Sequence, residues 1–77
     1  MQIHEVTAKL RPELEMRHPS AEVVFGAVYN TEDLHKDTGT AYVRIASKPY
    51  QVDYEIQFGA VKLECVPLFS ETLEDAA

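Results

Sequence analysis

The chain has 77 residues, of which 45% are hydrophobic and 26% are charged, a composition typical of one small folded domain over residues 1–77. Thirteen acidic residues against seven basic ones give a net charge of −6, which argues against direct nucleic-acid binding, because that affinity comes largely from Lys and Arg. One cysteine excludes an intramolecular disulfide framework. No signal peptide or membrane-spanning stretch is recognisable, so we expect a soluble, cytoplasmic protein.

A helix is predicted near the N-terminus. Between residues 3 and 18 the apolar residues recur at steps of three and four, at Ile3, Val6, Leu10 and Leu14. Pro12 removes one helical hydrogen bond and disfavours helical geometry at the residue before it. The helix therefore either kinks at Pro12 or is a shorter helix that starts there, and Pro19 marks its end.

The first strand is predicted over residues 22–30, from their β-branched and aromatic content. Strict alternation divides its side chains between two faces, with Val23, Phe25, Ala27 and Tyr29 on one and Val24, Gly26 and Val28 on the other. Both faces are apolar, so we expect the helix to cover one of them and a second subunit to be a candidate for the other. The residues of such a homodimer face are Val24, Val28 and Tyr42.

The segment over residues 31–40 is polar, and we expect a connection with a single helical turn capped by Thr31. Its carboxylates form a candidate second acidic patch, composed of Glu32, Asp33 and Asp37. The spacing of His35 and Asp37 is suited to acid–base chemistry, but a metal site needs three or four convergent ligands and a catalytic site needs a pocket. We therefore expect no enzymatic activity, no metal and no cofactor.

Three more strands are predicted, over residues 41–47, 52–58 and 61–67. A four-residue loop around Pro49, over residues 48–51, joins the first two. Gly59 and Ala60 form a type II′ turn between the last two, since that turn favours Gly at its first position. One longer strand with a bulge at Gly59 is the alternative.

The type II′ turn predicts which side chains oppose one another. On the apolar face it opposes Phe58 to Val61, Ile56 to Leu63 and Tyr54 to Cys65. On the other face it opposes Glu55 to Glu64, a pair of like charges that destabilises a sheet. Arg44, predicted beside Glu55, would offset that repulsion.

The predicted fold class is α+β, with one N-terminal helix packed on a four-stranded antiparallel sheet in two layers. The helix covers the face that carries Val43, Ile45, Tyr54, Ile56, Phe58 and Leu63. Cys65 points inward as a small buried hydrophobe rather than a nucleophile. Leu68 and Phe69 are candidates to tuck against the sheet, and residues 69–77 are expected to form a frayed acidic tail.

The function that we expect is carried by the face away from the helix, where Asp53, Glu55 and Glu64 form a row of carboxylates. Such a row competes with a phosphate backbone for a basic groove, which predicts a non-enzymatic inhibitor or adaptor that occupies the nucleic-acid-binding surface of a basic protein partner. In size, charge and α+β build the chain resembles DNA-mimic inhibitors and some phage anti-CRISPR proteins, although no family motif matches.

Two alternatives remain open at this point. The first is a homodimeric structural or assembly protein that buries its apolar sheet face. The acidic residues are also consistent with a solvated surface that serves only solubility.

Overall fold

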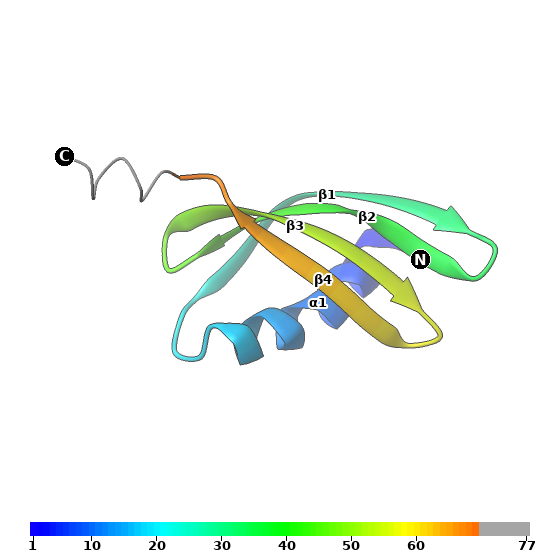
Figure 1. The fold of residues 1–77 in the computed structure, drawn as a ribbon, viewed down its shortest axis with the longest axis horizontal. Helices are drawn as coiled ribbons and strands as arrows, with labels where there is room; N and C mark the ends of the chain where they lie inside the picture. Colours follow the sequence, from blue (N-terminus) through cyan, green and yellow to red (C-terminus); the bar gives the residue numbers. More distant parts are fainter. Residues whose placement is uncertain (70–77) are drawn as a thin grey trace.

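In the computed structural model, which describes residues 1–69, one helix lies under a four-stranded antiparallel sheet (Figure 1). The elements are α1 (Ile3–Arg17), β1 (Val23–Asp33), β2 (Lys36–Ile45), β3 (Lys48–Gln57) and β4 (Ala60–Pro67). Their order in the sheet is β1-β2-β3-β4, so each strand pairs with the next one along the chain. The predicted α+β class is confirmed. The predicted frayed tail lies outside the described residues, except for Phe69.

The helix α1 continues through Pro12, so the alternative of a shorter helix that starts at this proline is wrong. Proline has no N–H, and the carbonyl of Ala8 therefore loses its helical partner. Both residues are exposed, where water can replace the lost hydrogen bond. The opposite side of the helix is fully buried at Val6, Leu10 and Leu14. This side packs against the sheet, and the sheet face that it covers is called the inner face below.

The strands are longer than predicted, and the turns between them are shorter. β1 and β2 extend through the segment predicted as a polar loop, and Leu34 and His35 form a two-residue turn between them. β3 begins at Lys48, and the turn before it consists of Ala46 and Ser47 rather than a loop around Pro49. These two residues have φ values of 52° and 67°, as in a type I′ turn, whose twist matches that of paired strands.

The turn between β3 and β4 lies one residue earlier than predicted, at Phe58 and Gly59. Both residues have positive φ, 51° and 77°, which again fits a type I′ turn instead of a type II′ turn at Gly59 and Ala60. The shift moves every cross-strand partner by two residues but leaves each side chain on its predicted face. Tyr54 thus opposes Leu63 rather than Cys65. Phe58, predicted to face the helix, is instead 85% exposed.

The hydrophobic core lies between α1 and the inner face. The sheet contributes seven buried side chains to it, from Val23, Ala41, Val43, Ile45, Val52, Tyr54 and Ile56. Leu63 and Cys65 are half-buried against this core, as their predicted inward orientation requires. Burial raises the pKa of the Cys65 thiol, which keeps it in the protonated, weakly nucleophilic form.

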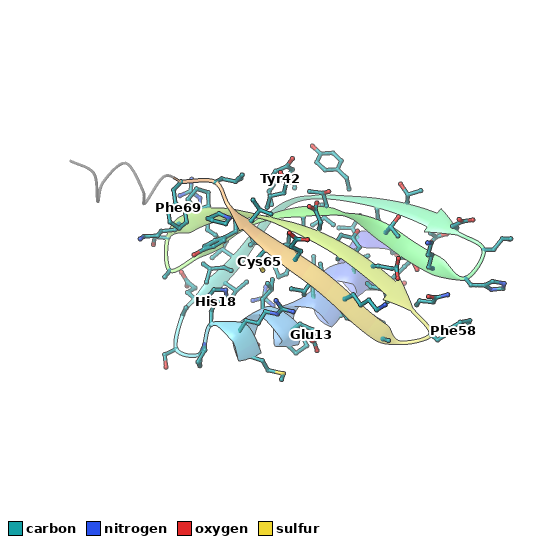
Figure 2. The ribbon with its side chains drawn as sticks, viewed as in Figure 1. Glu13, His18, Tyr42, Phe58, Cys65 and Phe69 are labelled. Carbon is teal, nitrogen blue, oxygen red and sulfur yellow. The ribbon has the colours of Figure 1, made fainter. Side chains whose placement is uncertain are left out.

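The chain after β4 stays close to the sheet through residue 69. The N–H of Leu68 donates to the carbonyl of Pro49 at 3.0 Å and so extends the β3–β4 ladder. The ring of Phe69 packs edge-on against Tyr50 with 5.3 Å between the ring centroids. Tyr50 in turn contacts His18, at the C-terminal end of α1, so that an aromatic cluster joins the helix to the sheet (Figure 2).

Gly39 permits a close approach between strands on the inner face. A Cβ atom at this position would lie 1.9 Å from the carbonyl oxygen of Tyr29 and 2.7 Å from the hydroxyl of Tyr54. That hydroxyl donates to Oδ1 of Asn30 at 2.7 Å and lies 3.2 Å from the Tyr29 carbonyl. The space that a side chain would fill is therefore occupied by a partly buried hydrogen-bonding network.

Gly39→Ala tests this close approach. We expect it to lower the free energy of unfolding by about 3 kcal/mol or more, because backbone and a hydrogen-bonded hydroxyl must both move. Gly26→Ala is the matched control, since its Cβ would lie 3.2 Å from the Tyr42 carbonyl, and it should cost about 1 kcal/mol or less. Urea denaturation of both variants measures the difference, and equal losses would contradict the packing described here.

Candidate functional site

The outer face of the sheet, which points away from α1, is not covered by any helix or strand within residues 1–69 (Figure 1). Two groups of side chains lie along its strands, and the basic residues Lys36, Arg44 and Lys62 lie on the same face. One group, called the acidic row, consists of Asp53, Glu55 and Glu64. The other, called the apolar end, consists of Val24, Tyr42, Pro49, Val66 and Leu68.

The acidic row brings together the three carboxylates predicted from the sequence, but in a different arrangement. Asp53 opposes Glu64 across the β3–β4 ladder, and Glu55 opposes Lys62. The predicted opposition of Glu55 to Glu64 is therefore wrong, because the turn at Phe58 and Gly59 displaces each partner by two residues.

The cations near the acidic row also differ from the prediction. Arg44 opposes Pro49, far along the ladder from Glu55, since the short turn at Ala46 and Ser47 changes the β2–β3 register. Lys36 lies near Glu55 instead, with 3.6 Å between its Nζ and a carboxylate oxygen. Glu55 thus has Lys36 on one side and Lys62 on the other.

No cation pairs with Asp53 or Glu64 in the described part of the chain. Asp53 is held in place by neutral donors, the hydroxyl of Thr40 at 2.9 Å and the amide of Gln51 at 3.3 Å. Two carboxylates directly opposed on a sheet destabilise it, and at roughly 5 Å in water their repulsion is about 0.8 kcal/mol before screening. Asp53 and Glu64 therefore form an uncompensated acidic pair on an open surface.

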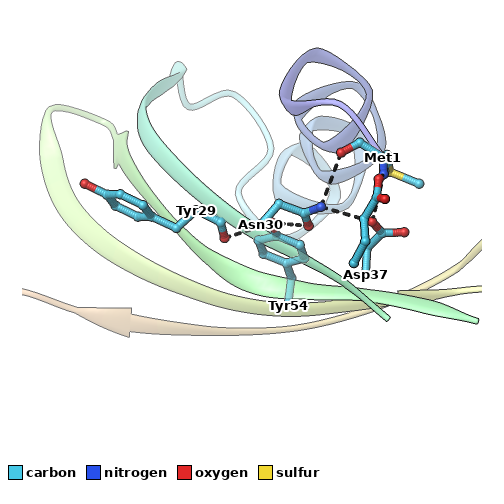
Figure 3. A network of polar contacts seen from close by, with 6 residues as sticks. Met1, Tyr29, Asn30, Asp37 and Tyr54 are labelled. Carbon is cyan, nitrogen blue, oxygen red and sulfur yellow. Dashed lines mark hydrogen bonds and ion pairs between the residues drawn. The ribbon is translucent and has the colours of Figure 1, made fainter. Parts of the chain in front are cut away.

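The predicted second acidic patch does not form one surface. Glu32 and Asp37 oppose each other on the inner face, and both pair with the amino group of Met1, which lies 3.1 Å from Asp37 Oδ1 (Figure 3). Asp37 also accepts a hydrogen bond from the amide of Asn30 at 3.0 Å. Asp33 lies at the β1–β2 turn and accepts from the N–H of Leu34 at 2.8 Å. Each of these carboxylates binds a group of its own chain, and the three do not lie on one common surface.

A β-bulge in β1 changes which residues reach the outer face. Phe25 opposes Val43 and Val28 opposes Ala41, so β1 has one more residue than β2 over this interval. Val28 consequently packs against the core, and its predicted place in an outer dimer face is wrong. Tyr29 is turned outward by the same bulge. Gly26, an isolated glycine within a strand, is the sequence signal that could have predicted it.

The apolar end and Tyr29 form an exposed hydrophobic area that the sequence predicted only through Val24 and Tyr42. The exposed fractions are 48% for Val24, 39% for Tyr42, 38% for Val66 and 48% for Leu68. A shallow groove of about 320 Å³ lies here, lined among others by Val24, Tyr42, Pro49 and Leu68. The ring of Tyr29 packs edge-on against that of Tyr42, with centroids 6.3 Å apart. Since Tyr29 pairs with Thr40 and Thr40 with Asp53, this aromatic pair lies beside the acidic row.

Residues 1–69 contain no group of three or more His, Cys, Asp or Glu side chains that could hold a metal ion. His35 lies apart from the acidic row, stacked on the exposed ring of Phe58 with 6.0 Å between centroids. Within the same residues, no helix has both the length and the apolar character needed to cross a membrane. Comparisons with protein-family models, with curated proteins and with solved structures found no match.

Glu64→Gln tests whether the acidic pair is uncompensated. The variant should raise the free energy of unfolding by at most about 0.8 kcal/mol, because it removes the repulsion with Asp53. Glu55→Gln is the matched control and should lower it slightly, because Glu55 lies between two lysines. Both effects should shrink at high salt. In a dilute, monomeric sample, loss of stability in Glu64→Gln at low salt would show that Glu64 has a cationic partner in its own chain.

Asp37 should contribute to acid stability. The hydrogen bond from Asn30 holds its pKa below the ordinary value of 3.8, and the Met1 amino group acts in the same direction. A lowered folded-state pKa gives stability that is fully present above 3.8 and is lost as the pH falls through the folded value. Asp37→Asn should therefore be less stable than the wild type at pH 7 and should approach it as the pH falls below 3.8 and through the lowered pKa of Asp37. A difference between the two proteins that stays constant over this range would contradict the assignment.

Proposed function

We propose that the protein is a non-enzymatic acidic binding protein, an inhibitor or adaptor whose outer sheet face occupies a basic, nucleic-acid-binding surface of a protein partner. The observation that carries the proposal is the uncompensated pair of Asp53 and Glu64. In the free protein their repulsion costs stability. A Lys or Arg of a partner placed between them would remove that cost and donate hydrogen bonds to both carboxylates at once, which is a strong, charge-assisted arrangement.

The geometry of the acidic row favours binding over simple solvation. Asp53 and Glu55 lie on a strand, about 6.8 Å apart along it, and Glu64 lies on the neighbouring strand. Thr40 and Gln51 orient the Asp53 carboxylate, so less conformational entropy is lost when a partner binds. An ordered set of carboxylates can replace the phosphates for which a basic groove is built, as in DNA-mimic inhibitors and some phage anti-CRISPR proteins.

The aromatic pair beside the row supports the same proposal. Tyr29 is 64% exposed, and Tyr42 contacts it on the side of the apolar end. Tyrosine gives a large contact area with little loss of side-chain entropy, and its ring attracts the guanidinium groups that a basic surface presents. The net charge of −6 adds long-range attraction to such a partner. We propose that such a partner is met in the cytoplasm.

A second candidate function rests on the apolar end. Three large hydrophobic side chains, Val24, Tyr42 and Leu68, are exposed around one groove on an open face, which Arg44 also lines. Contiguous apolar patches of this type mark interaction surfaces. A structural or assembly protein would bury them against the same face of a second copy. Val24 and Tyr42 belong to this surface, whereas Val28 does not.

The double variant Asp53→Lys/Glu55→Lys tests the leading proposal. The wild-type protein should capture a basic partner from its native host, lose it as salt is raised, and be displaced by duplex DNA or RNA. The double variant, folded by circular dichroism, should bind that purified partner at least about tenfold more weakly. Glu15→Lys/Glu22→Lys is the control, since it reverses two exposed charges away from the outer face and should bind within about twofold of the wild type.

The proposal is contradicted if the double variant binds the purified partner as tightly as the wild type. It is also contradicted if the affinity does not depend on salt. In that second case the apolar end, rather than the acidic row, carries the contact.

A further inference from the structure

The outer edge of β4 is unpaired within residues 1–69, because β4 is the last strand of the sheet. The two-residue turn at Phe58 and Gly59 makes Gln57 and Ala60 a hydrogen-bonded pair, after which such pairs alternate along the ladder. The hydrogen bond from the N–H of Leu68 to the carbonyl of Pro49 fits this alternation, because Leu68 is an even number of residues after Ala60. The even-numbered residues of β4 therefore direct their backbone groups to β3. Val61, Leu63 and Cys65 direct theirs outward.

The side chains of Val61, Leu63 and Cys65 lie on the inner face, at its margin. Each of them packs against the core and is only half-buried. A strand added to this edge would pair with three free N–H groups and three free carbonyls, and would also cover three incompletely buried apolar side chains.

The other edge of the sheet is protected, unlike that of β4. β1 contains the bulge between Phe25 and Val28, which interrupts regular pairing. The carbonyl of Val23 already accepts a hydrogen bond from Arg11 at 3.0 Å, and the Arg11 guanidinium lies 5.2 Å from the Phe25 ring centroid. In β4 the ladder is regular from Ala60 to Val66, and the only proline, Pro67, is its last residue.

We propose that the free edge of β4 pairs with the β4 edge of a second copy of the chain, antiparallel and with the two-fold axis at Leu63. A second copy of the chain is the occupant that fits this edge, because the charges of Lys62 and Glu64 are complementary when two copies of β4 pair. A two-fold axis perpendicular to the sheet keeps both helices on the same side, and it must pass through a residue that opposes itself. An axis at Lys62 would place the two copies of Lys62 opposite each other, and an axis at Glu64 would do the same with Glu64, so that like charges meet. With an axis at Val61 or Cys65, Lys62 and Glu64 do not oppose each other.

The axis at Leu63 is the register that opposes Lys62 to Glu64 of the second copy, twice. These two residues occupy closely spaced positions, where Cα atoms are about 4.5 Å apart, and neither makes an ion pair within the described chain. Leu63 meets Leu63 of the second copy on the inner face, and Val61 meets Cys65. Glu64 thereby gains the cation that it lacks in one chain, while Asp53 of both copies remains open on the outer face.

Charge exchange tests the register. The wild-type protein should show a concentration-dependent monomer–dimer equilibrium in sedimentation, and Lys62→Glu or Glu64→Lys should each weaken the dimer about tenfold or more. The double variant Lys62→Glu/Glu64→Lys should restore it. Glu64→Lys relieves the repulsion with Asp53, so loss of its dimer is not a consequence of unfolding. A monomer at all concentrations, or no restoration in the double variant, overturns the proposal.

Oxidative cross-linking supplies a second test. Val61→Cys places a thiol opposite Cys65 of the second copy at about 5.5 Å between Cα atoms, within the range of a disulfide, and should give a covalent dimer. The wild type should not cross-link, since its two Cys65 residues lie on opposite sides of the axis. Cross-linking of the wild type, or failure of Val61→Cys to cross-link, overturns the register.

Two control variants separate this proposal from the proposed function. Asp53→Asn removes one carboxylate of the acidic row without placing a new charge opposite Glu64, and it should dimerise like the wild type, whatever its effect on the basic partner. Val24→Lys alters the apolar end and should dimerise equally. A dimer that Val24→Lys dissociates is the face-to-face dimer of the second candidate function, and that result overturns the edge pairing.

Discussion

The two-residue turn at Phe58 and Gly59 determines the charge arrangement on which the rest of the account depends. Both residues have positive φ, and for a bulky residue such as Phe58 this conformation costs roughly 1–2 kcal/mol. The turn sets the β3–β4 register, which opposes Asp53 to Glu64 and Glu55 to Lys62. It also decides which residues of β4 direct their backbone groups to the free edge. A turn one residue later would direct the groups of Lys62 and Glu64 outward instead.

The alternation of apolar residues was sufficient to predict the faces of the sheet but not its register. The predicted and observed partners on β3 and β4 differ by two residues, and those on β2 and β3 by six. Both differences are even, so Val43, Ile45, Tyr54 and Ile56 are buried as predicted. Which charges lie next to each other depends on the residue directly opposite on the neighbouring strand, and not only on the face of the sheet. For this reason the acidic row was found, whereas the neighbours of Glu55 and Glu64 were not.

The remaining differences come from contacts between distant parts of the chain. The polar residues 31–40 have weak strand propensity, yet they continue β1 and β2 because pairing with neighbouring strands overrides composition. The roles of Asp37 and Glu32 depend on the amino group of Met1, far away in the sequence. Strict alternation also failed at Gly26, where the bulge exchanges the faces of Val28 and Tyr29. A glycine within a strand indicates such a bulge without fixing its position.

The β3–β4 register is the central claim, and Hα–Hα contacts in a nuclear Overhauser spectrum measure it directly. In an antiparallel ladder these contacts are strongest between opposed residues that are not hydrogen-bonded. The account predicts them between Tyr54 and Leu63 and between Val52 and Cys65. Strong contacts between Gln57 and Lys62 or between Glu55 and Glu64 would instead place the turn at Gly59 and Ala60, and would contradict both the acidic pair and the edge pairing.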